Sequence, residues 1–342
     1  MHPLHDALAS LDLLHPLSFL AVFLVASLLM IWRLEALQAG GLEGTALGTL
    51  VMPYCSGLGN LVFVFLLLRD HGPPGEIVIN SVVNNATNLT LLLGLPAAIW
   101  GLRVLPAATP TASAKIRGRK ARARSVDTAA PRLTRLSLLL TLTAVGFFTG
   151  AIWALGQDGT LDRTDGWALI GLFVFWQCFQ VFDVLKHNVR QNVRYGLRFY
   201  ADLFVVLLGA WLVYESLDAL VAGLAARDEG FFSAARLGWI TGWLLVLPNA
   251  LLAFYYAARG RADVVYSSQV GDGHICIPLC IGLFAAFRPI TLPDIFEPAM
   301  AVIGGAALVH ALCLLLGGRL PRWVGVGLIG AYGWFLYTGL LG

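Results

Sequence analysis

The feature that most constrains this chain is a series of apolar segments, each long enough to cross the hydrocarbon core of a membrane. A spanning helix needs about 20 predominantly apolar residues. The chain has 342 residues, of which 58% are hydrophobic and 13% charged, too few polar residues to cover a soluble domain of this length. Segments of sufficient length cover residues 17–37, 44–68, 76–102, 136–156, 166–185, 199–225, 232–258, 263–287, 294–317 and 322–341. We therefore expect an all-α integral membrane protein of about ten transmembrane helices.

Basic residues divide unequally between the two sides of this arrangement, which fixes its orientation. Five of the 23 Lys and Arg residues fall on one side, namely Arg69, Arg163, Arg227, Arg236 and Arg288. The other eighteen are Arg33, Arg103, Lys115, Arg117, Arg119, Lys120, Arg122, Arg124, Arg132, Arg135, Lys186, Arg190, Arg194, Arg198, Arg259, Arg261, Arg319 and Arg322. Because basic loops stay in the cytoplasm, we expect both termini to be extracytoplasmic, in a bacterial inner membrane.

The predicted helices and basic segments divide the chain into consecutive parts. The segment 103–135 is rich in Ala, Pro, Thr and basic residues without apolar periodicity, so we expect an irregular cytoplasmic loop near anionic headgroups; a specific partner site is the alternative. The net charge of only +3 gives no reason to expect nucleic acid binding. The parts are a short N-terminus (1–16), helices one to three (17–102), the basic loop (103–135), helices four and five (136–188), a linker (189–198) and helices six to ten (199–342).

Two halves of five helices imply an inverted repeat, because an odd number of crossings reverses the orientation of the second half. Such repeats are common in secondary transporters, where paired interrupted helices point to the substrate site. Gly59-Asn60 interrupts the second predicted helix, and Pro248-Asn249 interrupts the seventh. Asn60 precedes Gly94 by 34 positions, and Asn249 precedes Gly282 by 33. The two halves therefore carry polar interruptions at matching positions.

Polar side chains at these interruptions are the candidate ligands. Asn84 and Asn88 are four residues apart and share a helix face, and Asp272 and Cys276 repeat this spacing in the eighth helix. With Asn60 and Asn249, these residues would form a cage of amide oxygens and one carboxylate, which suits a cation that sheds its water. The alternative for each asparagine is a hydrogen bond between helices.

Asp272 is the strongest single candidate, because a carboxylate in the middle of a membrane helix costs about 3 kcal/mol on insertion scales. Its alternative role is that of a structural partner for an unidentified donor. The sequence has no P-loop, HExxH or GxSxG motif, so we do not expect an enzyme. An intramembrane enzyme would need a reactive pair, and Cys276 near Asp272 is the one pair that fits this description.

These motifs resemble those of the sodium/calcium exchanger (cation/calcium antiporter) superfamily. Segments 50–101 and 243–289 are similar to its two alpha-repeats. Gly59-Asn60 and Pro248-Asn249 stand at the first motif of each repeat. The second motif is matched by Val83-Asn84-Asn85-Ala86-Thr87-Asn88, followed by Leu91-Leu92-Leu93-Gly94, and by Gly271-Asp272-Gly273-His274-Ile275-Cys276, which is followed by Gly282. The resemblance implies a secondary cation antiporter that works by alternating access, with no cofactor. It also implies that the transported ion is sodium, a proton or calcium, and that the ion ligands are Asn60, Asn84, Asn88, Asn249, Asp272 and Cys276.

The chain departs from this family at two positions. Family members bind ions chiefly through one glutamate in each repeat, and the matching residues here are Phe63 and Leu252. Calcium affinity rises with the number of charged ligands, so a site with one carboxylate is expected to hold a monovalent cation or a proton better than calcium. The departure leaves open a second reading, in which the chain is a non-exchanging relative that acts as a membrane scaffold or carries a different solute. The sequence does not indicate an oligomeric state.

Overall fold

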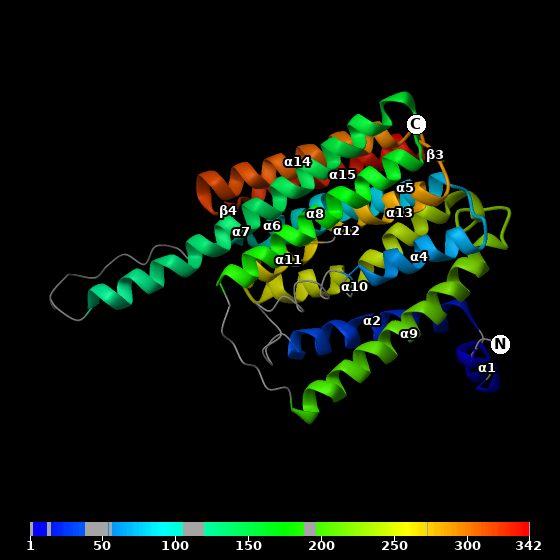
Figure 1. Ribbon diagram of the computed structural model, residues 1–342, viewed down its shortest axis with the longest axis horizontal. Helices are drawn as coiled ribbons and strands as arrows, with labels where there is room; N and C mark the ends of the chain where they lie inside the picture. Colours follow the sequence, from blue (N-terminus) through cyan, green and yellow to red (C-terminus); the bar gives the residue numbers. More distant parts are fainter. Residues whose placement is uncertain are drawn as a thin grey trace. The chain divides into compact units, whose positions relative to one another are not determined.

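The computed structural model describes residues 3–11, 15–37, 54, 57–104, 120–187, 196–271 and 273–341. Asp272 and most of the N-terminal half of the second predicted helix therefore lie outside the described residues. The described chain is almost entirely helical (Figure 1). Both halves pass through their shared elements in the same order, with a π-helical segment in the third helix of each half and short strands before and after the fourth.

The elements of the first half begin with a short helix before the first span. They are α1 (Pro3–Ser10), α2 (Pro16–Leu37), α4 (Leu58–Arg69), α5 (Gly75–Ala86), η2 (Thr87–Leu91, π-helical), α6 (Leu92–Trp100), β1 (Leu102–Arg103), α7 (Lys120–Leu155), η3 (Gly156–Asp158), β2 (Thr160–Leu161) and α8 (Arg163–His187).

The elements of the second half follow. They are α9 (Leu197–Ala225), η4 (Ala234–Arg236), α10 (Leu237–Ala258), α11 (Ala262–Gly271), α12 (Gly273–Ile275), η5 (Cys276–Ile281, π-helical), α13 (Gly282–Phe287), β3 (Ile290–Thr291), α14 (Phe296–Gly317), β4 (Arg319–Leu320) and α15 (Arg322–Leu340).

Within the described residues, nine helical spans are long and apolar enough to cross a membrane. The helix α4, which is shorter, stands at the place of the second predicted span. The prediction of an all-α membrane protein is therefore confirmed. The nine spans are Pro16–Leu34, Gly75–Trp100, Arg135–Asp158, Arg163–Phe182, Leu197–Ala225, Ala234–Ala258, Ala262–Phe287, Phe296–Gly317 and Arg322–Leu340.

The expected irregular loop over 103–135 is wrong for its second part. The helix α7 begins at Lys120, well before the apolar span that starts at Arg135. Alanine, arginine and lysine are strong helix formers even where no apolar stripe marks a helix face. The absence of apolar periodicity therefore did not exclude helical backbone here.

The expected interruption at Pro248-Asn249 is also wrong, because α10 continues through both residues. A proline inside a membrane helix removes one backbone hydrogen bond, and neighbouring groups compensate for it. The irregularity lies instead in the next helix of each half, where η2 and η5 replace regular α-helical turns. A π-helical turn contains an additional residue, and such turns are frequent at functional sites.

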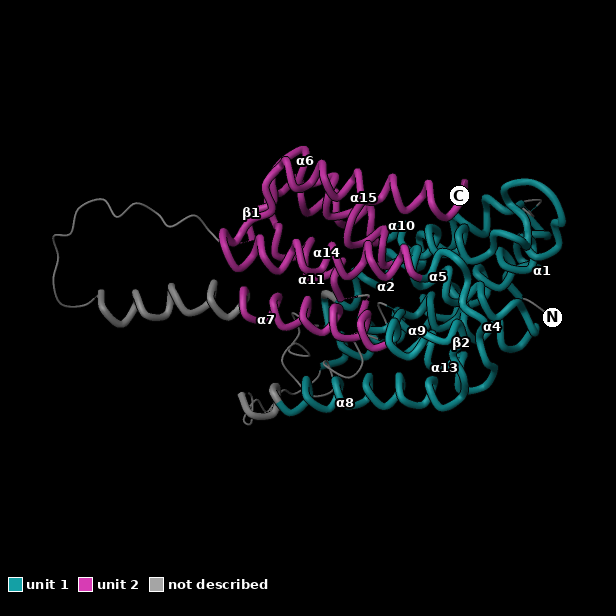
Figure 2. The backbone as a smooth tube through the Cα atoms, turned by 90° about the horizontal axis from the view of Figure 1, so that it is seen from above, with its two compact units in different colours: residues 1–84, 152–248, 274–296 teal, residues 85–151, 249–273, 297–342 magenta. Residues whose placement is uncertain are grey.

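The helices form two compact units, shown in teal and magenta in Figure 2. Unit 1 contains residues 1–84, 152–248 and 274–296, and unit 2 contains residues 85–151, 249–273 and 297–342. The boundaries fall inside α5, α7, α10 and α12 and after the first residue of α14. Each unit therefore combines segments of both sequence halves.

Inside unit 1, the third helix of the second half packs closely against the fifth helix of the first. A Cβ atom at Gly282 of α13 would lie 2.9 Å from Leu169 Cβ and 3.1 Å from the carbonyl oxygen of Gly166, both on α8. Next to this contact, β2 pairs with β3 in antiparallel register, Thr160 opposite Thr291. Glycine is required here because the helix backbones approach each other directly.

Unit 2 contains the corresponding contact with the halves exchanged. A Cβ atom at Gly325 of α15 would lie 2.6 Å from both the carbonyl oxygen of Gly94 and the backbone nitrogen of Ala98, on α6. Here β1 pairs with β4, Leu102 opposite Leu320. Each unit is thus built on a third helix from one half and a fifth helix from the other.

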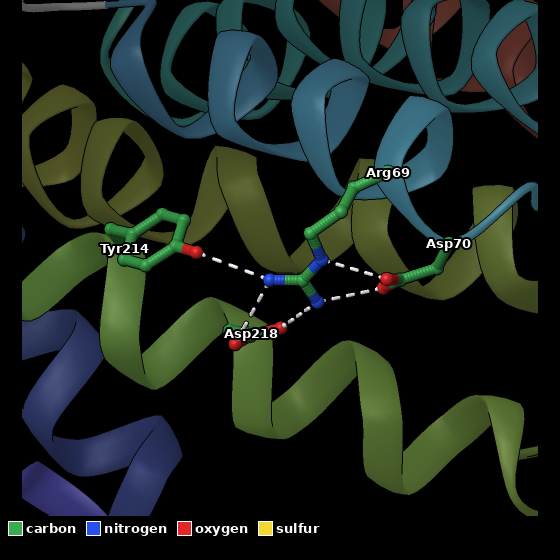
Figure 3. A network of polar contacts seen from close by, with 4 residues as sticks. All are labelled: Arg69, Asp70, Tyr214 and Asp218. Carbon is green, nitrogen blue, oxygen red and sulfur yellow. Dashed lines mark hydrogen bonds and ion pairs between the residues drawn. The ribbon is translucent and has the colours of Figure 1, made fainter. Parts of the chain in front are cut away.

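The helices α2 and α9 of unit 1 pack along each other and are joined by an ion pair, with Arg33 Nη1 3.1 Å from Asp202 Oδ1. At the other end of α9, Arg69 of α4 donates hydrogen bonds to Asp218 at 2.7 Å and to the hydroxyl of Tyr214 at 3.1 Å (Figure 3). Arg69 also pairs with Asp70, and this hydrogen bond holds the pKa of the Asp70 carboxyl below its usual range. These contacts attach α9 to both α2 and α4.

We predict that Gly325→Ala destabilises the protein, because the added methyl group overlaps the backbone of α6 at Gly94 and Ala98. Overpacking of this kind costs about 1–3 kcal/mol. The thermal unfolding midpoint of the purified protein in detergent measures the effect. Gly330→Ala in the same helix is the control, since nothing lies within 4 Å of its added methyl. Equal midpoints for the two variants would contradict the close packing of α6 and α15.

Candidate cation site

The helix α5 carries the densest set of buried polar side chains among the described residues. Asn80, Ser81, Asn84 and Asn85 are at most 1% exposed. The helix forms because Gly75 follows two prolines and Glu76 provides an acidic residue in the first turn, where the helix dipole favours it. Its polar face is therefore held inside the protein and away from lipid.

Two of the predicted ligands come into direct contact in unit 1. The thiol of Cys276, at the start of η5, donates to Asn84 Oδ1 with a sulfur to oxygen distance of 3.9 Å. Both residues are fully buried. The structure thus joins one candidate from the first sequence half with one from the second.

The helix α4 contributes Asn60 and Phe63, both in unit 1. Asn60 lies in the first turn of α4 and is 4% exposed, and no described residue donates a hydrogen bond to its Oδ1. Phe63, at the position of an expected glutamate, is completely buried. The helix α4 therefore carries a buried aromatic ring, Phe63, and a buried amide oxygen, Asn60 Oδ1, that has no partner among the described residues.

The remaining described candidates lie in unit 2. Asn88 is fully buried within η2. Asn249 is half-buried on α10, and its backbone carbonyl accepts a hydrogen bond from Gln269 Nε2 of α11 at 3.3 Å. Leu252, which the sequence comparison aligns with the second expected glutamate, is half-buried. The structure therefore links α10 to α11 through the Asn249 backbone.

The π-helical segment η2 is held by side chains from other helices of unit 2. His310 Nε2 lies 2.7 Å from the carbonyl oxygen of Leu89, and the hydroxyl of Tyr266 lies 2.9 Å from His310 Nδ1. Because a carbonyl only accepts hydrogen bonds, Nε2 carries the hydrogen, and in the neutral ring Nδ1 accepts from Tyr266. The hydroxyl of Tyr332 also contacts that of Thr87 at 3.0 Å. The irregular backbone therefore has specific partners.

The structure shows no cluster of three or more metal-ligating His, Cys, Asp or Glu side chains within the part of the chain that it describes. Asp272, the predicted carboxylate, lies outside that part. The described donor set consists of amide oxygens, hydroxyls and a thiol. Such a set is neutral, so it leaves Asp272 as the one charged member of the predicted site.

Sequence reasoning missed two polar residues of α5 that contact α10 in unit 1. The buried Glu76 accepts a hydrogen bond from the backbone N–H of Gly238, and Asn80 Nδ2 donates to Thr241 Oγ1 at 3.0 Å. A Cβ at Gly242 would lie 2.8 Å from Val83 Cβ. The signals were present in the sequence: a Gly-x-x-x-Gly motif at 238–242 and the four-residue spacing of Glu76, Asn80 and Asn84.

Comparisons with known proteins agree with this fold. The family model for sodium/calcium exchanger protein matches residues 13–182. A solved structure of the sodium-calcium exchanger NCX_Mj, soaked with 2.5 mM Na+ and 1 mM Sr2+, aligns with a TM-score of 0.62 over 94% of this chain and 96% of that chain, at 17% identity. No curated protein sequence matches the chain.

A second structure of NCX_Mj, soaked with zero Na+ and Ca2+, gives a TM-score of 0.59 at 16% identity, over 93% of this chain and 96% of that chain. At this identity the likeness establishes the shared membrane fold. The chain belongs to the sodium/calcium exchanger protein family, whose model matches residues 13–182.

Proposed function

We propose that the protein is a secondary active antiporter that exchanges a monovalent cation, sodium, against protons by alternating access of its two halves. The observation that supports this most directly is the pair of π-helical segments, η2 and η5, which lie at matching positions of the two halves. Each contains a buried polar candidate, Asn88 and Cys276. Irregular backbone with buried polar side chains is typical of the ion sites of membrane transporters.

The charge of the candidate ligands favours a monovalent ion. The proposed ligands Asn60, Asn84, Asn88 and Asn249 are neutral, and Asp272 supplies one negative charge. A single carboxylate that binds either a sodium ion or a proton exchanges one for the other, because the two ions compete for the same charge. Calcium requires more charged oxygen ligands for high affinity. We therefore do not expect this protein to bind calcium with high affinity.

The orientation of the chain follows from its basic residues. Because eighteen of 23 lie on one side of the predicted topology, we place that side in the cytoplasm of a bacterial cell and both termini outside the inner membrane. Sodium would then enter from the side that contains the loop between α4 and α5.

The complete burial of Phe63 favours a second candidate function, that of a relative that no longer exchanges ions and carries another solute or acts as a scaffold. An aromatic ring at the position of an ion-binding carboxylate removes both its charge and the space for water. Thermal unfolding of the purified protein separates the two functions. An antiporter is stabilised by its ion, whereas the scaffold would show the same midpoint in sodium, potassium, calcium and at different pH values.

We predict that Asp272→Asn abolishes exchange. Proteoliposomes that contain a pH-sensitive dye are exposed to an inward sodium gradient, and the wild-type protein should drive proton efflux. The asparagine variant keeps the size of the side chain but removes the charge, so its rate should fall to that of empty liposomes.

Asp263→Asn is the matched control, since Asp263 is exposed on α11 and pairs with Arg261 at 3.3 Å. This control should transport at the wild-type rate. Normal exchange by the Asp272 variant would contradict the proposed site. Absence of sodium-driven proton movement in the wild-type protein would contradict the proposed antiport.

A further inference from the structure

The orientation of the buried Asn80 amide is determined by its partner on α10. Thr241 Oγ1 donates its hydrogen to the carbonyl of Leu237 at 2.7 Å, one turn earlier in α10. The hydroxyl therefore faces Asn80 only as an acceptor, and the group of Asn80 at 3.0 Å from it must be the Nδ2 donor. This bond turns Asn80 Oδ1 away from Thr241.

Asn80 Oδ1 has no hydrogen-bond donor among the described residues, although Asn80 is completely buried. A buried acceptor without a partner is costly and calls for a physical explanation. The amide is not free to rotate and correct this, because rotation would place an oxygen against the acceptor Thr241 Oγ1. Asn80 thus presents a fixed carbonyl oxygen in the interior of unit 1.

Glu76 lies one helical turn before Asn80 on the same face of α5. It is 8% exposed, and its Oε2 accepts a hydrogen bond from the backbone N–H of Gly238. Within the described part of the chain, no basic side chain pairs with it. The corresponding first-turn acid of α11, Asp263, is exposed and neutralised by Arg261. Glu76 therefore differs from its counterpart in being buried and in having no basic partner among the residues that the structure describes.

We propose that Glu76 and Asn80 form a cation-binding station that is separate from the Asp272 site and binds a monovalent ion such as sodium. One carboxylate and the amide oxygen of Asn80, about one helical turn apart, provide oxygen ligands and a single negative charge. The station rests on the proposed function, as the point where the ion enters from the end of α5 next to the loop at residues 70–74. Asn84 continues the same face one turn further.

A purely structural role for Glu76 is the competing explanation, since a carboxylate at the start of α10 also stabilises that helix. Glu76→Gln separates the two roles. The amide oxygen of glutamine still accepts the Gly238 hydrogen bond, but the charge is lost. Asn80→Ala provides an independent test, because it removes Oδ1 and leaves Glu76 and its hydrogen bond in place.

The experiment measures the thermal midpoint of the full-length protein in detergent as sodium chloride replaces choline chloride at constant ionic strength. It starts from Asp272→Asn, so that the remaining sodium response belongs to the new station. We add Glu76→Gln or Asn80→Ala to this variant. Either substitution should raise the sodium concentration that gives half of the midpoint shift by about tenfold or more, which is the typical effect of losing a charged or buried ligand. Adding Glu297→Gln, an exposed first-turn acid of α14, should change nothing.

The station is contradicted if Asp272→Asn shows no sodium response, or if that response survives both added substitutions. A lower midpoint for Glu76→Gln with an unchanged sodium dependence would also overturn it and leave only the role of helix cap. Failure of the proposed antiport has a different signature, namely sodium stabilisation of the wild-type protein without sodium-driven proton movement. The two hypotheses are therefore tested separately.

Discussion

The architecture depends on backbone contact between helices at glycine residues. Without a difference in polarity between lipid tails and apolar side chains, membrane helices associate through close packing and hydrogen bonds. Gly282 on Gly166 in unit 1 and Gly325 on Gly94 in unit 2 provide this packing at matching positions. Each pair joins a third helix to a fifth helix of the opposite sequence half. The third helices, which carry the polar residues, are thereby fixed within the units.

Close packing also brings buried polar groups within hydrogen-bonding distance of partners on neighbouring helices. The carbonyl of Leu89 in η2 is bonded to His310, and Asn80 is bonded to Thr241 between two glycines of α10 that admit α5. Each polar residue is therefore held in one orientation. Fixed oxygen atoms replace the hydration shell of an ion without further rearrangement, which is the requirement for binding a cation inside a membrane.

The sequence predicted the helices well because membrane thickness fixes their length. Asn84, Asn88 and Cys276 could be chosen as candidates because polar residues stand out in apolar segments, and the structure shows that all three are buried. The sequence prediction was wrong at Pro248, where the helix continues because neighbouring groups compensate for the missing hydrogen bond. It was also wrong for the start of α7 at Lys120, where helix-forming residues occur without an apolar pattern. Glu76 was not predicted as a functional residue because acidic residues are common in the first turn of a helix. Only the packing of α10 against α5 shows that Glu76 is buried.

The proposed function depends on one claim, that the protein binds a monovalent cation with Asp272 as the single proposed carboxylate ligand. Equilibrium binding of radioactive sodium to the purified wild-type protein tests this claim most directly, with calcium as the competitor. We expect saturable sodium binding that protons displace and that calcium displaces only weakly. Tight calcium binding that excludes sodium, or the absence of saturable sodium binding, would contradict it.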